Sequence, residues 1–319
     1  MVQAINWALH HAMGQDPNVV LLGEDVAQFG GVFRATEGLL NQFGEDRVLD
    51  TPLAESGIVG CSVGMALYGL RPIAEMQFSG FAYQAFHQIE QHVSRYCNRS
   101  RGTYPMSMVL RMPYGGGVRA FEHHSESREA YFVHTPGLKV IIPATPKDAY
   151  GLLRQSIEDP DPVIFMEPKK LYRSIKEPMP DPDYRVPLGK ARVVREGNDL
   201  SLIGYGAMVG TCLEVAEAFQ DRYSLEVIDL RTLSPLDRPA IIQSVQKTGR
   251  AVVVHEAPRT LGMGAEISAT LMEGAFDYLK APIKRVTGYD TPIPYFQLEN
   301  YYIPDVRRIS EAVVEAMKY

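Results

Sequence analysis

The sequence predicts an α/β fold with two doubly wound domains, each built on a mainly parallel sheet. Three observations support this fold. Short apolar runs alternate with helical patterns along the chain, polar residues follow the ends of several runs, and the alternation breaks once, between Pro168 and Pro187, where prolines and charges dominate. We therefore predict a first domain over residues 1–175, a linker over 176–190 and a second domain over 191–319.

In the first half, the apolar runs predict six strands: Asn18–Leu22, Arg47–Asp50, Pro72–Phe78, Met106–Met112, Leu138–Ile142 and Val163–Met166. Helices are predicted at residues 1–13, 36–43, 58–70 and 82–99, and one begins after Thr145; the first and the fourth show helical spacing of apolar residues. This last helix has a Thr145 cap, Pro146 at its first position and Asp148 in its first turn.

The second half repeats the alternation. Strands are predicted at Leu200–Ile203, Leu225–Leu230, Ala251–His255 and Ile283–Thr287, with helices ending at Phe219 and spanning 239–245, 264–278 and 305–317. The glycines at 204, 206 and 210 follow a strand and open a helix, but the last is one position late for a dinucleotide fingerprint. A tight turn is favoured, and a nucleotide-binding oxidoreductase remains an alternative.

Composition argues against several classes of protein. The 319 residues include 32 Lys and Arg against 38 Asp and Glu, a formal net charge of −6, and no basic run that would indicate nucleic-acid binding. Cys61, Cys97 and Cys212 lack metal-ligand spacing and indicate a reducing compartment. The first thirteen residues read as an amphipathic helix and not as a targeting segment, so we expect a cytoplasmic protein without a membrane span.

Glu55 lies at the junction of a predicted strand and the helix at 58–70. This helix is apolar on nearly every face and contains glycines, so it must be covered by its own domain and by a partner. Locally, Glu55 is either a first-turn carboxylate favoured by the helix dipole or a functional acid. Because ligands bind at the carboxyl ends of parallel strands, Glu24, Gln77 and the loop of His124 are candidates as well.

His123 and His124 lie in a polar loop that follows Gly115-Gly116-Gly117. Adjacent histidines are poorly spaced for zinc, and no third ligand is positioned by a motif. A single histidine in such a loop is more often structural than catalytic, and its glycine-rich approach is the one feature that favours function.

Five motifs occur along the chain: Thr51-Pro-Leu-Ala-Glu55-Ser-Gly-Ile, Arg71-Pro-Ile-Ala-Glu-Met-Gln77-Phe78, Gly115-Gly-Gly with His124-Ser-Glu-Ser127, Asp161-Pro-Val-Ile-Phe-Met-Glu167-Pro-Lys-Lys-Leu-Tyr-Arg173, and Lys247-Thr-Gly-Arg250 with His255-Glu. In this order and over the whole chain, they resemble the beta subunit of the thiamine-diphosphate-dependent 2-oxo acid dehydrogenases, of branched-chain or pyruvate type. The resemblance implies a pyrimidine-binding domain followed by a transketolase C-terminal-like domain.

The resemblance implies that Glu55 hydrogen-bonds a ring nitrogen of the coenzyme's aminopyrimidine and favours its imino tautomer. A charge-assisted bond of this kind contributes about 1.5–3 kcal/mol. Leu53, Gln77 and Phe81 are implied to hold the same ring, with Phe81 stacked on its face. Glu24 is implied to belong to an acidic path between paired cofactors.

By the same resemblance, His124 acts near the decarboxylated intermediate and the incoming lipoyl group, as a proton donor or an electrostatic partner. Two positions depart from the family pattern. The family usually has glutamine where Glu126 stands and proline where Arg128 stands.

A monovalent-cation site, of the kind that binds potassium, is also implied by the resemblance. It comprises carbonyls near Met108 and Val109 and the loop from Ser156 to Asp161, in which Asp159 and Asp161 offer oxygen ligands. The alternative for these two acids is a pair of solvated turn residues.

The chain has no Gly-Asp-Gly motif, which in this cofactor class supplies magnesium ligands for the diphosphate. A half-site implies a second polypeptide, an alpha subunit that holds magnesium in a two-alpha, two-beta assembly and contacts the helix at 58–70. The second domain is implied to pack the beta dimer and to dock the lipoyl acyltransferase core.

We therefore expect a 2-oxo acid dehydrogenase beta subunit, active only with an alpha subunit, for oxidative decarboxylation and reductive acylation of a lipoyl group. The Val286–Pro292 segment favours branched-chain substrates, and pyruvate is the alternative. A non-catalytic assembly scaffold is the alternative from another class.

Overall fold

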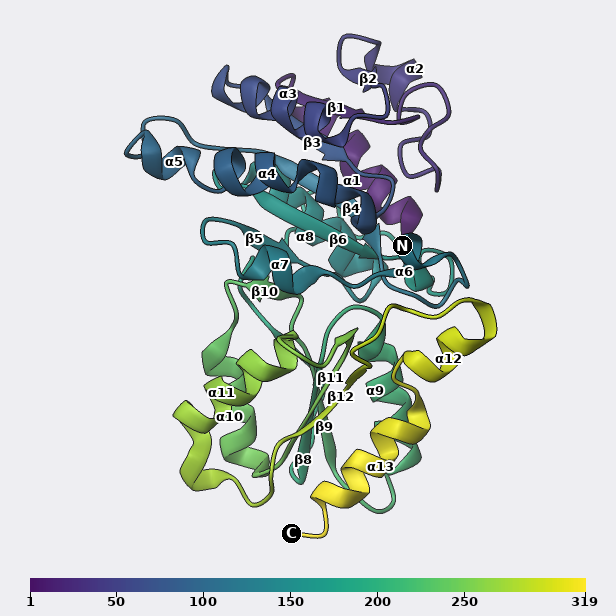
Figure 1. Ribbon diagram of the computed structural model, residues 1–319, viewed down its shortest axis with the longest axis vertical. Helices are drawn as coiled ribbons and strands as arrows, with labels where there is room; N and C mark the ends of the chain where they lie inside the picture. Colours follow the sequence, from purple (N-terminus) through teal and green to yellow (C-terminus); the bar gives the residue numbers. More distant parts are fainter. The chain divides into compact units, whose positions relative to one another are not determined.

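The computed structural model describes residues 1–319, and these fold into two compact units (Figure 1). The first unit comprises Met1–Tyr114 and Tyr131–Leu188, and the second comprises Gly115–Ala130 and Gly189–Tyr319. A segment from the first half of the chain is therefore part of the second unit. No helix or strand lies between residues 172 and 191, the stretch that includes the predicted linker.

The first unit is built on a parallel sheet whose strands run in the order β5-β6-β4-β3-β1-β2. The sheet is buried along most of its length because both faces of its strands are apolar, as parallel sheets require. The strands are β1 (Val19–Gly23), β2 (Val48–Asp50), β3 (Arg71–Glu75), β4 (Val109–Tyr114), β5 (Lys139–Ile141) and β6 (Val163–Pro168).

Helices flank this sheet, and α1 packs against α8. The predicted N-cap of α8 is confirmed, because the Thr145 side chain accepts a hydrogen bond from the Asp148 amide. The helices are α1 (Val2–Gln15), α2 (Leu39–Phe43), α3 (Glu55–Leu67), α4 (Phe86–Gln88), α5 (Tyr96–Arg99) and α8 (Pro146–Glu158), while α7 (Glu129–Val133) crosses the boundary of the units.

The prediction of one continuous helix over residues 82–99 was wrong. The segment is divided into a 3₁₀ turn (Ser79–Ala85), α4, a π-helical turn (Ile89–Val93) and α5. After the π-helical turn, the Ser94 hydroxyl donates a hydrogen bond to the carbonyl of Glu90, which competes with regular α-helical pairing.

The second unit is built on a sheet with the order β12-β11-β8-β9-β7, in which only β7 is antiparallel to its neighbour. Its strands are β7 (Arg192–Arg195), β8 (Leu200–Gly204), β9 (Leu225–Asp229), β11 (Ala251–Pro258) and β12 (Lys284–Gly288), and β10 (Thr232–Ser234) is a further short strand. The edge strand β7 was not predicted, because it is half exposed and is bounded by arginines.

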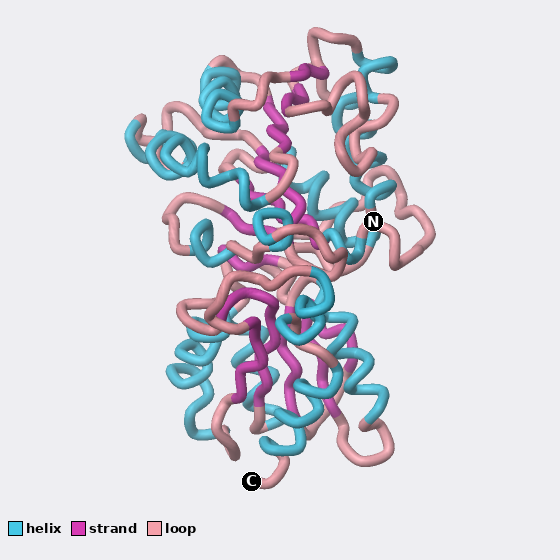
Figure 2. Tube along the Cα trace, turned by 45° about the vertical axis from the view of Figure 1, so that its right-hand side comes forward, coloured by secondary structure: helices cyan, strands magenta, loops and turns pink.

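Helices cover both faces of this second sheet. In Figure 1, α10 and α11 lie on one side of the strands and α9 and α13 on the other, and Figure 2 shows the same layering of helices around strands. The doubly wound prediction is confirmed. The helices are α6 (Glu122–Ser125), α9 (Ala207–Ala218), α10 (Arg238–Thr248), α11 (Met263–Ala275), α12 (Glu299–Tyr302) and α13 (Val306–Ala316).

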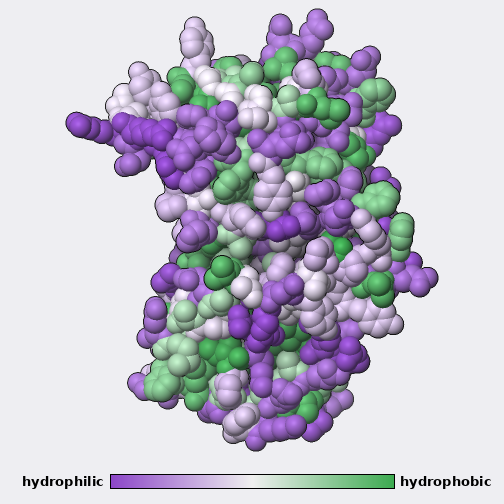
Figure 3. All heavy atoms as spheres, in the orientation of Figure 1, coloured by the Kyte–Doolittle hydropathy of each residue, from purple (hydrophilic) through white to green (hydrophobic).

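The surface in Figure 3 mixes hydrophilic residues with smaller groups of hydrophobic ones. Among the helices, none combines the length and the apolar character that a bilayer span needs.

A buried ion cluster joins three central strands of the first unit. Arg111 on β4 donates to Glu167 on β6, with Nε–Oε1 2.7 Å and Nη2–Oε2 3.1 Å, and to Glu75 on β3 at 2.6 Å. The Tyr172 hydroxyl donates to Glu167 at 2.6 Å. Burial raises the pKa of Glu75 and Arg111 opposes this shift, so the cluster depends on its one cation.

Replacing that cation should destabilise the first unit strongly. We expect Arg111→Met to lower the free energy of unfolding by about 3–5 kcal/mol, because two carboxylates remain buried without a cation. The deficit should shrink on acidification, because burial raises the pKa of Glu75 and a protonated Glu75 needs no cation. Urea unfolding at two pH values measures both effects. Arg95→Met, which breaks the exposed pair with Glu90, is the control and should cost less than about 1 kcal/mol.

Candidate active site

Three neighbouring strands place acidic and amide side chains at one edge of the first sheet. Glu24 follows β1, Glu55 opens α3 after β2, and Gln77 follows β3. Glu24 and Glu55 are only 4% and 7% exposed. Burial raises the pKa of Glu24, and the nearby charge of Glu55 raises it further. The structure therefore brings two predicted carboxylates together.

These carboxylates are not compensated within the chain. Oε1 of Glu24 is buried and has no hydrogen-bond partner, and no hydrogen bond or ion pair of the Glu55 carboxylate is seen. A buried acceptor without a donor is unfavourable, so this edge is suited to a ligand that carries hydrogen-bond donors.

Hydrogen bonds fix the loop that carries Glu24. Asp50 accepts from the amides of Ala27 and Gln28 at 2.7 and 3.1 Å, and Gln77 donates through Nε2 to Asp25 at 3.2 Å. Gln77 thus lies beside Asp25, the residue after Glu24, and its contact with a cofactor stays a prediction. Asp25 was not predicted as a site residue, although it directly follows the candidate Glu24 in the sequence.

The two apolar candidates differ in their surroundings. Phe81 packs edge-on against Phe78, with ring centroids 5.6 Å apart, and Phe78 packs in the same way against Phe33 at 5.6 Å. Leu53 is 82% exposed and lies between β2 and α3, two residues before Glu55. Both stay predicted cofactor contacts.

One face of α3 is bare within this chain. Gly57, Cys61, Gly64 and Tyr68 follow one another at helical spacing and are exposed, Tyr68 to 91%. A Cβ atom built at Gly64 meets no atom within 4 Å. The expectation that its own domain covers this helix is therefore met on one face only.

His124 lies on α6, inside the segment Gly115–Ala130, which we call the histidine segment and which is part of the second unit. Its ring centroid is 6.2 Å from that of Phe121, which packs edge-on against Tyr295. The two departures from the family pattern form an ion pair with each other, Arg128 donating to Glu126.

The end of the histidine segment is held by a buried acid that sequence reasoning missed. The Tyr205 hydroxyl donates to Oε1 of Glu129 at 2.5 Å, and burial raises the pKa of Glu129. No local pattern marks this pair, because the two residues lie 76 positions apart.

The five residues of the predicted cation site lie in one corner of the first unit. The Val163 amide donates to the Met108 carbonyl at 3.0 Å, and Ser107 donates to the carbonyl of Pro160 at 3.3 Å, so the strand at Met108 and Val109 adjoins the loop from Ser156 to Asp161. This proximity is what the resemblance implies.

The carboxylates of that corner are engaged with a lysine of the same chain, so their role as cation ligands stays a prediction. Lys139 donates to Asp159 at 2.6 Å and pairs with Asp161 at 3.1 Å. Burial alone lowers the pKa of Lys139, but its bonds to the two aspartates outweigh burial and raise it. An ammonium group already neutralises both acids.

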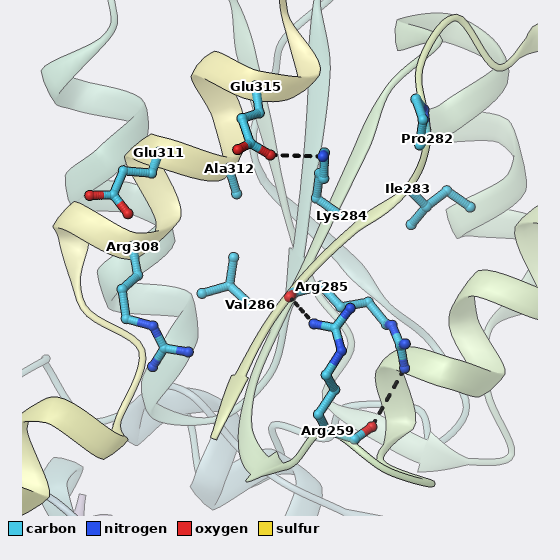
Figure 4. A pocket seen from close by; sticks show the side chains of 10 residues that line it. All are labelled: Arg259, Pro282, Ile283, Lys284, Arg285, Val286, Arg308, Glu311, Ala312 and Glu315. Carbon is cyan, nitrogen blue, oxygen red and sulfur yellow. Dashed lines mark hydrogen bonds and ion pairs between the residues drawn. The ribbon is translucent and has the colours of Figure 1, made fainter. Parts of the chain in front are cut away.

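A surface hollow of about 470 Å³ in the second unit is lined by none of the predicted catalytic, cofactor-binding or metal-binding residues (Figure 4). It lies beside β12 and α13. Arg259 donates to the carbonyl of Arg285 at 2.9 Å, and Lys284 pairs with Glu315 at 2.7 Å. Two of the basic side chains that line the hollow, Arg259 and Lys284, thus already bind other groups of this chain.

Comparison with known proteins identifies the family of each of the two halves of the chain. Residues 1–175 match the family described as the pyrimidine binding domain of transketolase, and residues 189–309 match the transketolase C-terminal domain. A solved structure described as a split gene transketolase, inactive beta4 tetramer, covers 99% of this chain and 97% of its own, with a TM-score of 0.81 and 23% identity. At that identity the likeness concerns the fold alone.

Curated relatives narrow the class further. The pyruvate dehydrogenase E1 component subunit beta of Staphylococcus epidermidis is 49% identical over 100% of this chain and 98% of its own. The 3-methyl-2-oxobutanoate dehydrogenase subunit beta of Mycobacterium tuberculosis is 49% identical over 100% of this chain and 92% of its own. The chain belongs to the family of 2-oxo acid dehydrogenase beta subunits, and the predicted family and fold are confirmed.

The raised pKa of Glu24 leads to a prediction about how the stability of the chain depends on pH. Because the pKa of Glu24 is raised, its charged form is disfavoured in the folded protein, and stability falls as the pH rises from the ordinary pKa through the raised one. We expect Glu24→Gln to be more stable than the wild type at pH 8, by on the order of 0.5 kcal/mol after solvent screening, and similar at pH 4.

Thermal unfolding of the isolated chain at both pH values tests this expectation. Glu45→Gln, which changes an exposed acid of the same unit, is the control and should alter neither value. A Glu24→Gln variant that is less stable than the wild type at pH 8 would contradict the electrostatic interpretation of the pair.

Proposed function

We propose that this chain, together with an alpha subunit, catalyses thiamine-dependent oxidative decarboxylation of a 2-oxo acid and reductive acylation of a lipoyl group. The observation that carries the proposal is the uncompensated pair of Glu24 and Glu55, buried at the strand ends of a pyrimidine-binding fold. The relatives named as dehydrogenase beta subunits support the reaction class.

The residues of the first unit fit the pyrimidine end of thiamine diphosphate. Glu55 would accept a hydrogen bond from a ring nitrogen, which holds a proton there and leaves the exocyclic nitrogen basic. Leu53, Gln77 and Phe81 would orient the ring, and Glu24 would exchange protons with Glu55. When bound, the coenzyme supplies a carbon nucleophile that stabilises the charge left by decarboxylation.

His124 is proposed to donate a proton or stabilise charge where the lipoyl group is acylated. Its place on a segment that is held at Glu129 supports this role, because a general acid must be kept within hydrogen-bond reach of the reacting atom. Glu126 and Arg128, the two charged residues that depart from the family pattern, pair with and neutralise each other.

The alpha subunit is proposed to hold the diphosphate end and its magnesium ion, in a two-alpha, two-beta assembly that docks a lipoyl acyltransferase core. The bare glycine face of α3 supports a protein contact here, because glycines allow two helices to approach closely. This helix begins at Glu55, so the partner's helix would also close the acid site to water.

A potassium ion in the corner near Met108 would have to be held by main-chain carbonyls. Lys139 occupies the carboxylates of Asp159 and Asp161, so the proposal is limited to carbonyl oxygens near Met108, Val109 and Ser156.

For the substrate, we propose branched-chain 2-oxo acids, on the Val286–Pro292 segment, with pyruvate as the alternative. Of the two relatives at 49% identity, one is named as a pyruvate dehydrogenase subunit and the other as a 3-methyl-2-oxobutanoate dehydrogenase subunit. A cytoplasmic location is proposed as well, supported by three free cysteines.

Glu55→Gln tests the carboxylate. In an assembly reconstituted with an alpha subunit, we expect decarboxylation to fall by about 10²-fold or more, since the amide cannot hold the proton on the ring. A panel of 2-oxo acids, assayed for CO₂ release with and without thiamine diphosphate, also ranks branched-chain acids against pyruvate. Glu45→Gln is the matched control. Undiminished activity of the Glu55→Gln variant would remove the mechanism.

Gly64→Leu tests the α3 face. The isolated chain should be at least as stable as the wild type, because leucine is favoured over glycine in a helix by about 1 kcal/mol and the site is open. Assembly with the alpha subunit, measured by light scattering, should be lost. Gly14→Leu on α1, where a Cβ also meets no atom within 4 Å, should assemble normally. Normal assembly of both variants would place the contact elsewhere.

A further inference from the structure

The histidine segment begins with three main-chain amides that point at two buried carboxylates. The amide of Gly116 donates to Oε2 of Glu256 at 3.0 Å. The amides of Gly117 and Arg119 donate to Oε1 and Oε2 of Glu299 at 2.9 and 3.0 Å. Glu299, at the start of α12, is 1% exposed and uses both of its oxygens for this one segment.

The glycine run is explained by this contact. A Cβ atom at Gly116 would lie 2.7 Å from Oε1 of Glu299, which is closer than real Cβ atoms approach. Gly115 and Gly117 have positive φ values of 79° and 90°, which are strained for other residues. Glycine at these positions lets the backbone wrap around the carboxylate.

Side-chain packing holds only part of this stretch, where the ring of Phe121 contacts those of Tyr295 and Phe296. Val118 and Phe121 are 46% and 59% exposed, and Gly117 and Arg119 are exposed as well. From Gly116 to Arg119, the hydrogen bonds to carboxylates are therefore the main polar restraint, and each such bond is stronger than a neutral one.

We propose that Glu299 is a positioning residue for His124. Its carboxylate fixes the backbone five to seven residues before the histidine, and Glu256 supports the same turn from β11. This role rests on the proposed function, in which His124 serves lipoyl acylation. Glu299 acts through the segment and does not touch the reacting atoms.

Glu299→Gln is the sharpest variant, because it keeps the shape of the side chain but replaces one acceptor oxygen with an amino group. One amide of the segment then faces a donor. In the isolated full chain, we expect hydrogen–deuterium exchange of the peptide covering residues 115–125 to accelerate by about 10-fold or more. The strand β8 should exchange as in the wild type, which shows that the unit is folded.

Two further variants keep the test decisive. Gly116→Ala presses a Cβ against Glu299 from the other side and should accelerate exchange in the same peptide. Glu311→Gln, which changes an exposed acid of the same unit, should change nothing. Unchanged exchange in both Glu299→Gln and Gly116→Ala would overturn the proposal.

The catalytic arm uses the assembly reconstituted with an alpha subunit. With Glu299→Gln, acylation of a lipoyl domain should fall by about 10-fold or more, while decarboxylation with an artificial electron acceptor should stay within about 3-fold, since Glu299 restrains only the histidine segment. Equal losses of both activities, or full acylation despite faster exchange, would overturn the positioning role. The exchange arm needs no activity, so a wild-type assembly that is inactive would count against the proposed function and leave the carboxylate contact to be judged by itself.

Discussion

The parallel pairing of β1 with β2 and β3 is the constraint on which the site depends. Leu21 is in register with Val48 on one side and Ile73 on the other, so the three strands end at one edge of the sheet. Side chains far apart in sequence, Glu24 and Glu55, therefore meet there. Without this pairing neither acid has a reason to lie near the other, since no contact within the chain draws them together.

The first unit contains two kinds of buried acid: one kind is paired with a cation and stabilises the fold, and the other is unpaired and belongs to the candidate site. Glu75 and Glu167 share the guanidinium of Arg111 and thus stabilise the centre of the sheet. Glu24 and Glu55 have no such cation, and burial together with the charge of Glu55 raises the pKa of Glu24. Acids that are buried without compensation are typical of sites that are completed by a ligand or a second protein.

Much of the fold and part of the site followed from local patterns. Alternation of strands and helices predicted both sheets, and the strand-to-helix junction singled out Glu55. Long-range contacts were not accessible in this way. Nothing around Asp159 indicates that Lys139 neutralises it, and nothing around Gly116 indicates Glu299, because such pairs are set by tertiary packing and not by any periodicity along the chain.

The assignment of residues 115–130 to the second unit has a consequence for how such chains diversify. A crossover between two related genes near residue 180, where the chain forms neither helix nor strand, would cut no such element. It would nevertheless pair one parent's glycine run with the other parent's Glu256 and Glu299. Recombination should succeed only where both parents agree at these positions, so the two halves are inherited as a matched set.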